Sequence, residues 1–402
     1  MYYKRKITDD IYYVGENDRR IERFENMFEL PDGVAYNSYL ILDQKTALLD
    51  GIDEAVSERY YENIRFALDG RDLDYLIVNH VEPDHCSSIN NVLREYPNAT
   101  MVITQKGLQF MEQFYNLDYQ DRVQIVGEGD KLDLGKHQLE FIMAPNVHWP
   151  EVMVTYDHTD NVLFSADAFG SFKAIAGHLF ADQVNFERDW LEEARRYYMN
   201  IVGRNGPSVM RLFKKLVDFD LKIIAPLHGV VFRTPEMIEM ILDKYTKWAT
   251  YEPEEPGVVL ACASMYGDSQ NMNDILAAML ADRGVPNIRV YDISKTSPSQ
   301  VIADVFRFSN AVFTCLTYNT QLYPGMDALL REIAMLNYAN RKISFLENQS
   351  WGGRALAIAQ EILGKCKNLE IIGEPFKIKS SVAPEQMDEL AKLADEIAAS
   401  IE

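Results

Sequence analysis

After Gly257 the chain alternates between short apolar runs and longer amphipathic stretches, and this alternation constrains the fold more than any other feature. Each apolar run predicts a strand, and each following stretch predicts a helix. The predicted strands are 258–263, 288–291, 311–315, 342–346 and 369–372, and the predicted helices are 271–282, 298–308, 326–336, 355–363 and 384–400. Five such units favour an α/β fold with a doubly wound, mostly parallel sheet, whose ligands bind beyond the carboxyl ends of the strands.

The segment Tyr251-Glu-Pro-Glu-Glu-Pro256 separates this regular half from a different first half. Two prolines and three carboxylates in six residues predict an extended, solvated connector. The first half mixes short predicted strands with helical stretches, which suits two sheets with outer helices; the strands include 46–50, 100–103 and 122–126, and the helical stretches are 54–69, 188–202 and 206–218. We therefore expect domains at 1–250 and 257–402, joined by a linker at 251–256.

Potential metal ligands gather in His80-Val-Glu82-Pro-Asp84-His85, directly after the apolar run Leu76-Ile-Val78. Pro83 discourages continuation as strand or helix, so we expect a tight turn at a strand's end. Three further candidates also follow predicted strands: His148, Asp167 and His228. Because loops that follow strands converge on one edge of a sheet, the seven residues are expected to form one site.

The ligand types favour iron, although ligand type alone leaves zinc and manganese open. Imidazole suits zinc, iron, copper and nickel, whereas carboxylates draw a site toward harder ions. A zinc hydrolase built on this loop would typically present two histidines where this chain has His80 and Glu82. The extra anionic ligand offsets charge on an oxidised iron pair, and Asp167 can bridge two ions. We interpret the remaining histidines, His137, His158 and His178, as structural.

Three loops in the second half predict a cofactor site. Ser264-Met-Tyr-Gly-Asp-Ser269 lies between a strand and a helix, where hydroxyls and backbone N–H groups bind phosphate, although an N-capping turn is the simpler alternative. The chain lacks Gly-Lys-Ser/Thr there, which argues against a nucleoside triphosphate, and Gly-x-Gly-x-x-Gly, which argues against a dinucleotide. Thr317-Tyr-Asn-Thr-Gln-Leu-Tyr-Pro324 and Asn348-Gln-Ser-Trp-Gly-Gly353 place aromatic residues at the same sheet edge, where a flat ring could stack.

The metal-ligand motif resembles that of flavodiiron proteins, and the three loops are similar to a flavodoxin-like FMN site. The resemblance implies a metallo-β-lactamase-like αββα sandwich followed by a flavodoxin-like doubly wound parallel sheet. It also implies two non-haem irons, one bound by His80, Glu82 and His148, the other by Asp84, His85 and His228, with Asp167 as the bridge. The residues expected to bind FMN are Ser264, Met265, Tyr266, Gly267, Asp268, Ser269, Thr317, Tyr318, Asn319, Thr320, Ser350, Trp351, Gly352 and Gly353.

Two departures from the family pattern bear on the flavin. Leu316 stands where the family commonly has proline, and Glu347-Asn348-Gln349 is more polar than the usual loop. We still expect FMN to bind. The two departures are expected to change either the flavin potential or the identity of the side chain that stacks on the flavin.

The resemblance implies an oxidoreductase that reduces O2 to water, NO to N2O, or both. FMN would accept electrons from rubredoxin or another small donor and pass them to the diiron centre. A head-to-tail homodimer, or a dimer of such dimers, would bring the FMN of one chain to the irons of another. No separate acid or base is assigned; Tyr197 and Tyr198 either reach the pocket or only pack in a helix. The alternatives are a dizinc hydrolase, which Glu82 argues against, and a flavodoxin-like carrier with a structural metal domain.

Composition narrows the partners and the compartment. The net charge of −21 argues against nucleic acid and anionic lipid surfaces. No apolar stretch approaches the roughly 18–20 residues that cross a bilayer, and no secretory leader is visible at the N-terminus. The four cysteines lie far apart without a Cys-x-x-Cys pair, which argues against a built-in rubredoxin and against a disulfide framework. We expect a cytoplasmic protein whose electron donor is a separate molecule.

Overall fold

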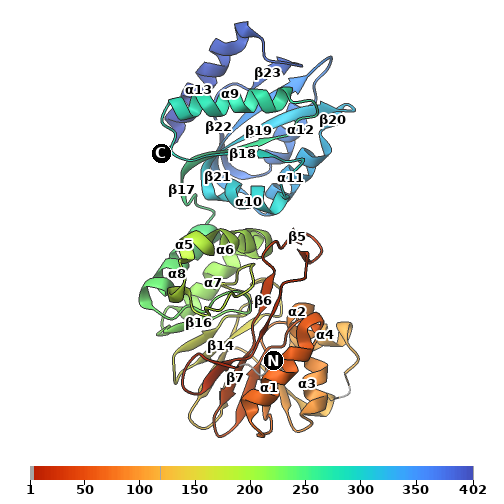
Figure 1. The fold of residues 1–402 in the computed structure, drawn as a ribbon, viewed down its shortest axis with the longest axis vertical. Helices are drawn as coiled ribbons and strands as arrows, with labels where there is room; N and C mark the ends of the chain where they lie inside the picture. The colour runs from red at the N-terminus through yellow and green to blue at the C-terminus, as the bar shows by residue number, and fades with distance from the viewer. Residues whose placement is uncertain (1–3, 118, 402) are drawn as a thin grey trace. The chain divides into compact units, whose positions relative to one another are not determined.

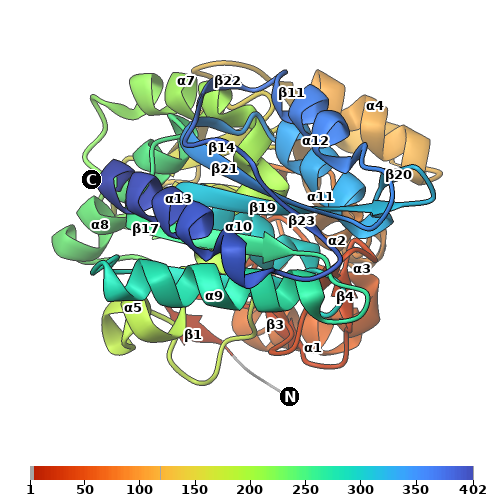
Figure 2. The same ribbon diagram turned by 90° about the horizontal axis from the view of Figure 1, so that it is seen from above.

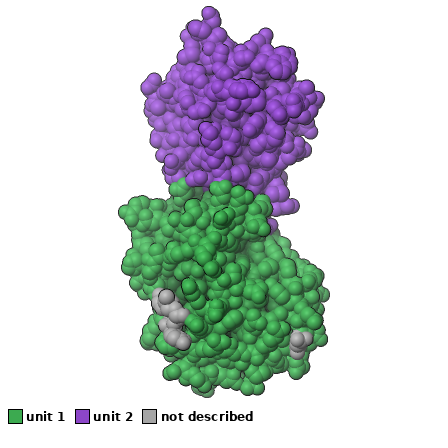
Figure 3. All heavy atoms as spheres, turned by 45° about the vertical axis from the view of Figure 1, so that its right-hand side comes forward, with its two compact units in different colours: residues 1–198, 207–245 green, residues 199–206, 246–402 purple. Residues whose placement is uncertain are grey.

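The computed structural model describes residues 4–117 and 119–401, which form two compact units (Figure 3). Unit 1 comprises Met1–Tyr198 and Pro207–Tyr245, and unit 2 comprises Met199–Gly206 and Thr246–Glu402. The short segment Met199–Gly206 therefore groups with the second unit although it is flanked in sequence by the first. Each unit has its own sheets and helices (Figure 1).

Unit 1 is built on two main sheets, ordered β1-β2-β7-β8-β9-β10-β11 and β12-β13-β14-β15-β16. The first sheet contains β1 (Arg5–Lys6), β2 (Ile11–Tyr13), β7 (Tyr39–Leu42), β8 (Thr46–Leu49), β9 (Tyr75–Val78), β10 (Thr100–Thr104) and β11 (Val123–Val126). The second contains β12 (Lys131–Asp133), β13 (Gln138–Met143), β14 (Met153–Asp157), β15 (Val162–Phe164) and β16 (Ile223–Ala225). The rings of Tyr39 and Phe164, one from each sheet, lie 5.4 Å apart, so the core lies between the sheets.

Helices cover the outer faces of this sandwich. Contacts place α1 and α4 against the first sheet, and Lys215 of α7 donates to the carbonyl of Met143 in the second, 2.7 Å away. The helices are α1 (Ser57–Leu68), α2 (Pro83–Cys86), α3 (Ile89–Glu95), α4 (Gln105–Phe114), α5 (Phe186–Asp189), α6 (Leu191–Tyr197), α7 (Gly206–Leu216) and α8 (Pro235–Ala249). A π-helical turn, Tyr198–Val202, follows α6. Two short antiparallel strand pairs complete the unit: β3 (Glu16–Asp18) with β6 (Val34–Tyr36), and β4 (Arg23–Phe24) with β5 (Phe28–Glu29).

The expectation of a plain turn at Pro83 is wrong, because Pro83 is the first residue of the short helix α2. The fixed backbone of proline suits the first position of a helix, where its missing N–H is not needed. Asp84 and His85 therefore lie on one helical turn, with both side chains buried.

Unit 2 is a five-stranded parallel sheet, ordered β18-β17-β19-β21-β22, with two short strands added to it. The strands are β17 (Glu255–Cys262), β18 (Ile288–Asp292), β19 (Phe308–Tyr318), β20 (Gln321–Leu322), β21 (Ala339–Gln349), β22 (Lys367–Ile371) and β23 (Phe376–Lys379). The helices are α9 (Asp268–Asp282), α10 (Pro298–Arg307), α11 (Pro324–Met335), α12 (Ala355–Leu363) and α13 (Met387–Ser400). The five predicted strand–helix units are confirmed, whereas β20 and β23 were not predicted.

The helices of unit 2 cover both faces of its sheet. Figure 2 shows α9 and α13 side by side, and their buried leucines share a core cluster with Val258 and Leu260 of β17. Helices α10, α11 and α12 follow one another along the opposite face, as Figure 1 shows for α10 and α11. The carboxyl ends of β17, β19 and β21 consequently lie at one edge of the sheet.

The segment 251–256 is not the solvated connector that its composition predicts. The Tyr251 hydroxyl donates to the carbonyl of Gly203, 3.0 Å away, and the Trp248 indole donates to Glu254 at 2.7 Å. Glu255 already belongs to β17 and pairs with Arg307. Glu255 and Pro256 thus begin β17, and the carboxylates of Glu254 and Glu255 are satisfied by specific partners. The boundaries 1–250 and 257–402 remain our proposal for the domains.

Among the described residues, the longest helices are too short and too polar to cross a lipid bilayer.

Candidate metal centre and flavin site

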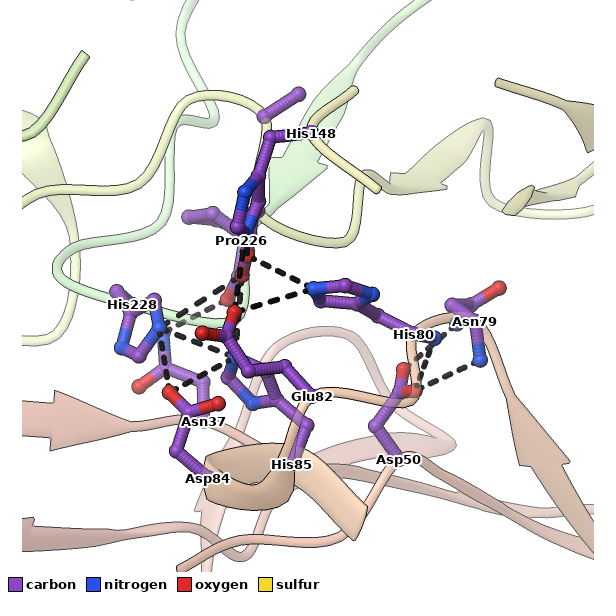
Figure 4. Close-up of polar contacts among 12 residues, drawn as sticks. Asn37, Asp50, Asn79, His80, Glu82, Asp84, His85, His148, Pro226 and His228 are labelled. Carbon is purple, nitrogen blue, oxygen red and sulfur yellow. Dashed lines mark hydrogen bonds and ion pairs between the residues drawn. The ribbon is translucent and has the colours of Figure 1, made fainter. Parts of the chain in front are cut away.

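Seven side chains from four loops of unit 1 converge on one buried site (Figure 4). His80 and Glu82 follow β9, and Asp84 and His85 lie on α2. The other three each follow a strand of the second sheet: His148 follows β13, Asp167 follows β15 and His228 follows β16. The structure therefore brings together all seven residues expected to bind metal.

The first ligand group consists of His80, Glu82 and His148, together with Asp167. The Nε2 atom of His80 lies 3.3 Å from Oε2 of Glu82 and 3.3 Å from Oδ2 of Asp167. The Nε2 atom of His148 lies 3.0 Å from each of the same two oxygens. Two imidazoles and two carboxylates thus point at one position.

The second ligand group consists of Asp84, His85 and His228. Oδ2 of Asp84 lies 3.3 Å from Nε2 of His85 and 3.2 Å from Nε2 of His228. Oδ1 of Asp167 lies 3.1 Å from the first of these nitrogens and 3.6 Å from the second. Asp167 therefore turns Oδ2 toward the first group and Oδ1 toward the second, which is the placement of a bridging carboxylate.

The lack of hydrogen-bond partners for two of these carboxylates fits a site that binds a pair of cations. Both side-chain oxygens of Asp84 and of Asp167 are buried without a hydrogen-bond partner in the described part of the chain. Buried carboxylates are costly unless they are paired or coordinate metal. Burial disfavours a charged imidazole, yet Asp167, Glu151 and Glu82 still raise the pKa of His80 well above its usual value. The site thus requires positive charge, and its nitrogen and oxygen donors suit transition metals.

A separate cavity of about 610 Å³ lies at the carboxyl edge of the sheet in unit 2. Twelve of the fourteen residues expected to bind FMN line it: Ser264, Met265, Tyr266, Asp268, Ser269, Thr317, Asn319, Thr320, Ser350, Trp351, Gly352 and Gly353. Gly267 and Tyr318 do not line it. Sequence reasoning did not assign five further lining residues: Leu316, Asn348, Gln349, Arg354 and Ser380.

One end of this cavity is formed by the N-terminus of a helix and the loop that precedes it. The 15-residue helix α9 begins at Asp268, and Gly267 before it has a φ of 100°, which favours glycine. The Ser264 hydroxyl accepts from the N–H of Gly267 at 3.0 Å, which closes the loop. Asn348 donates to the Ser269 hydroxyl at 3.0 Å and so fixes the first helical turn. Hydroxyls and free N–H groups at a helix N-terminus attract an anion.

Two aromatic rings flank the same cavity. The side chains of Tyr266 and Trp351 are 92% and 97% exposed, although both residues line the cavity. Large rings left in solvent beside a cavity are well placed to stack on a flat ligand.

Comparisons with known proteins find relatives that resemble nearly the whole chain. The model of the ODP family beta lactamase matches residues 34–229. An anaerobic nitric oxide reductase flavorubredoxin from Aeromonas hydrophila subsp. hydrophila is 30% identical over 356 residues, which cover 87% of this chain and 70% of that protein. The chain belongs to the flavodiiron protein family. The structure of rubredoxin oxygen:oxidoreductase from Desulfovibrio gigas aligns with a TM-score of 0.91 at 26% identity, covering 99% of this chain and 98% of that one. The flavodiiron protein from Giardia intestinalis, 23% identical, has the same fold, with a TM-score of 0.92 and coverage of 99% and 96%.

In this flavodiiron protein the histidines are oriented by hydrogen bonds at their Nδ1 atoms. Nδ1 of His80 lies 2.6 Å from Oε1 of Glu151, which also accepts from the N–H of Val81 at 3.0 Å. Nδ1 of His228 donates to the carbonyl of Ala35 at 2.8 Å. Sequence reasoning missed Glu151. Its only sequence signal is its place three residues after His148.

Aromatic side chains form one wall of the metal site. The ring of His228 lies 5.4 Å from the rings of both Phe24 and Tyr197. The Tyr197 hydroxyl is buried without a hydrogen-bond partner among the described residues. Burial and the carboxylates Asp167, Glu82 and Asp84 raise its pKa well above the usual value, so the hydroxyl keeps its proton. The structure places Tyr197 at the site, whereas the sequence left its role open.

Glu25 is a second residue that sequence reasoning missed. It lies on the turn between β4 and β5, with a φ of 49°. Burial of its carboxyl group and a hydrogen bond with Glu82 raise the pKa of Glu25 to about 8. Glu25 thus places a carboxyl group against a member of the first ligand group.

The remaining histidines lie outside both ligand groups. His137 forms a third cluster with Asp157 and Asp160. The Asp157 carboxylate lies 3.0 Å from Nδ1 of His137 and accepts from the backbone N–H groups of Thr159 and Asp160, so hydrogen bonds already satisfy it. His158 pairs with Glu140 at 2.7 Å, and His178 is exposed.

Proposed function

We propose that this flavodiiron protein is an oxidoreductase that reduces O2 to water, NO to N2O and water, or both. The observation that carries the proposal is the Asp167 carboxylate, which offers one oxygen to each of two buried ligand groups. A paired site can act on one O2 with four electrons and four protons, or on two NO with two electrons and two protons. The names of the Aeromonas and Desulfovibrio relatives, a nitric oxide reductase and a rubredoxin oxygen:oxidoreductase, support both substrates.

The cofactors in this proposal are two non-haem irons and FMN. His80, Glu82 and His148 would bind one iron, Asp84, His85 and His228 the other, and Asp167 both. The loop Ser264–Ser269 would bind the FMN phosphate, and Tyr266 and Trp351 would flank its ring. When bound, the iron pair supplies stored electrons and open positions for a diatomic molecule, and FMN supplies single-electron steps from the donor.

The residues around the metal groups would handle protons and water. The Tyr197 hydroxyl, which keeps its proton, is free to donate a hydrogen bond to a molecule bound beside His228. The rings of Phe24 and Phe172, 5.6 Å apart, exclude bulk water from that side. Glu25 places a carboxyl group against Glu82, from which a proton could be passed inward.

Electrons would reach the flavin from rubredoxin or another small donor. The cavity rim carries exposed apolar side chains, Met265, Tyr266, Tyr318 and Trp351, which suit contact with a second protein surface. We assign this surface to a second copy in a head-to-tail homodimer, which would place the FMN of one chain near the metal site of its partner. A reduced, cytoplasmic location suits a chain with free cysteines, three of them buried.

The experiment that tests the function is a direct comparison of the two gases. The protein, reduced anaerobically through a rubredoxin system, is mixed with O2 or with NO, and kcat/KM is measured for each. Turnover of either gas with reoxidation of the flavin supports the proposal, and the ratio gives the preference. Inertness toward both gases, with hydrolysis of an ester or lactam, would replace it with the dizinc hydrolase.

A further inference from the structure

The two ligand groups contain the same kinds of donor atoms but differ in the partners of the histidine Nδ1 atoms. Apart from the shared Asp167, each group has two imidazoles and one carboxylate. Behind His80 lies the Glu151 carboxylate, 2.6 Å from Nδ1. Behind His228 lies a neutral carbonyl, that of Ala35, at 2.8 Å, and Nδ1 of His85 is buried without a partner in the described chain.

Glu151 is fixed so that its charge acts on His80. Its side chain is only 1% exposed, and Oε1 accepts from the N–H of Val81 as well as from His80. The carboxylate therefore cannot turn to solvent, and the low local polarity preserves its effect. A carboxylate behind a metal-binding histidine fixes the ring and raises the basicity of its other nitrogen.

Charge adds to this difference between the groups. The first ligand group contains the Glu82 carboxylate and is also in contact with the Glu151 carboxylate. The second contains the Asp84 carboxylate, and Asp167 is shared by both groups. The first position thus has one more carboxylate in contact with a ligand side chain, and that carboxylate holds the His80 ring at Nδ1. In the second, Nδ1 of His85 has no hydrogen-bond partner among the described residues. We therefore expect the first position to bind a divalent ion more tightly than the second.

We propose that Glu151 is a positioning residue that makes the two metal positions unequal. The position at His80, Glu82 and His148 fills first and loses its ion last, and the position at Asp84, His85 and His228 is the exchangeable one. This inference rests on the proposed function in one respect, namely that the seven residues bind two ions.

The test is a metal titration of the purified full-length protein after removal of its metals. Co²⁺ is added alone, its visible absorption is followed, and a competing chelator gives the two dissociation constants. The wild-type protein is expected to bind two ions with dissociation constants that differ at least tenfold. The variant His228→Ala should keep the tighter equivalent, and His148→Ala should lose it.

Glu151→Gln removes the charge but keeps an oxygen that accepts from His80 and Val81. The tighter dissociation constant should rise about 10- to 100-fold, while the weaker one stays within about twofold. Glu140→Gln is the matched control, because Glu140 also pairs with a histidine, His158, but lies outside both ligand groups. That variant should bind both ions as the wild type does. Circular dichroism and FMN content should be equal in all three proteins, which excludes unfolding as the cause.

Three results would overturn the inference: equal constants in the wild type, unchanged constants in Glu151→Gln, or loss of the tighter ion in His228→Ala. Because the titration uses neither O2 nor NO, these failures are separate from failure of the proposed function. A protein that binds no second ion would instead contradict the proposed paired site itself.

Discussion

The Nε2 atoms of His85 and His228 lie 3.0 Å apart in a region that solvent does not reach. Nδ1 of His228 donates to a backbone carbonyl, so its Nε2 atom turns a lone pair toward His85. Carboxylate oxygens of Asp84 and Asp167 lie 3.1–3.6 Å from these nitrogens. So many electron-rich atoms are stable together only around positive charge, which two bound metal ions would supply.

Asp167→Ala should abolish the paired site, because Asp167 contributes an oxygen to both groups. Iron content is expected to fall from two per chain to less than one, and O2 or NO turnover should fall to background. Iron is measured by elemental analysis after purification and reconstitution. Asp218→Asn, which changes an exposed carboxylate outside both ligand groups, is the control and should retain two irons. Two tightly bound irons in Asp167→Ala would contradict the bridging role.

Tyr197→Phe should slow turnover without weakening the fold. The hydroxyl has no partner in the described structure, so its removal costs no protein hydrogen bond, and the free energy of unfolding should stay within about 0.5 kcal/mol of wild type or rise. If the hydroxyl donates to bound O2 or NO, kcat/KM should fall about 2- to 10-fold, which corresponds to the free energy of one hydrogen bond. Stopped-flow reoxidation with each gas gives the measurement. Unchanged kinetics with both gases would exclude that hydrogen bond.

Trp351→Ala and Tyr266→Ala should each weaken FMN binding. Aromatic stacking is worth about 0.5–1.5 kcal/mol, so each FMN dissociation constant should rise about 2- to 10-fold. Fluorescence titration of the flavin-free protein measures this, and metal content should not change. Tyr318→Ala is a suitable control, because Tyr318 is similarly an exposed aromatic but does not line the cavity. An equal loss in Tyr318→Ala would mean that the rim, and not the stacking rings, governs binding.

The stability of unit 1 should depend on pH through His137. Burial lowers the pKa of His137, but the hydrogen bonds to Asp157 and Asp10 outweigh it, and the net pKa is raised. The charged ring therefore stabilises the fold fully below its unfolded pKa of about 6.5, and this contribution is lost as pH rises through the higher folded value. The free energy of unfolding of the wild type should exceed that of His137→Gln by about 1–2 kcal/mol at pH 6. The lower end of this range is expected because Asp10 is partly exposed. The difference should shrink toward pH 9.

Urea unfolding at several pH values measures this difference. His158→Gln is the control, because the pair of His158 with Glu140 is partly exposed and such pairs contribute little at any pH. A difference that grows with rising pH would contradict the sign of the effect.

The sequence predicted the metal ligands better than their surroundings. His148, Asp167 and His228 could be found because each follows an apolar strand, and loops after strands meet at a sheet edge. Glu151 could not be found, since its role depends on the distance to His80, seventy-one positions earlier, which no local pattern encodes. The same reason hid Glu25, whose hairpin reaches Glu82 only in the folded chain.

The second unit followed its pattern more closely because strand–helix alternation is a local signal. The five main strands and helices were predicted, with ends that differ by a few residues. Short strands such as β23 and cavity residues such as Ser380 were missed, because pairing across the sheet, not periodicity, creates them. The connector was misjudged for a related reason: Tyr251 bonds to the distant Gly203 and Glu254 to the nearby Trp248, and composition reveals neither contact.

The most direct test of the diiron centre is anomalous diffraction from crystals of the purified, active protein, recorded at the iron and zinc absorption edges. Two iron peaks are expected in unit 1, one beside His80 and His148 and one beside His85 and His228, with the Asp167 carboxylate between them. A single peak, or two peaks that appear only at the zinc edge, would contradict the diiron centre on which the proposed function rests.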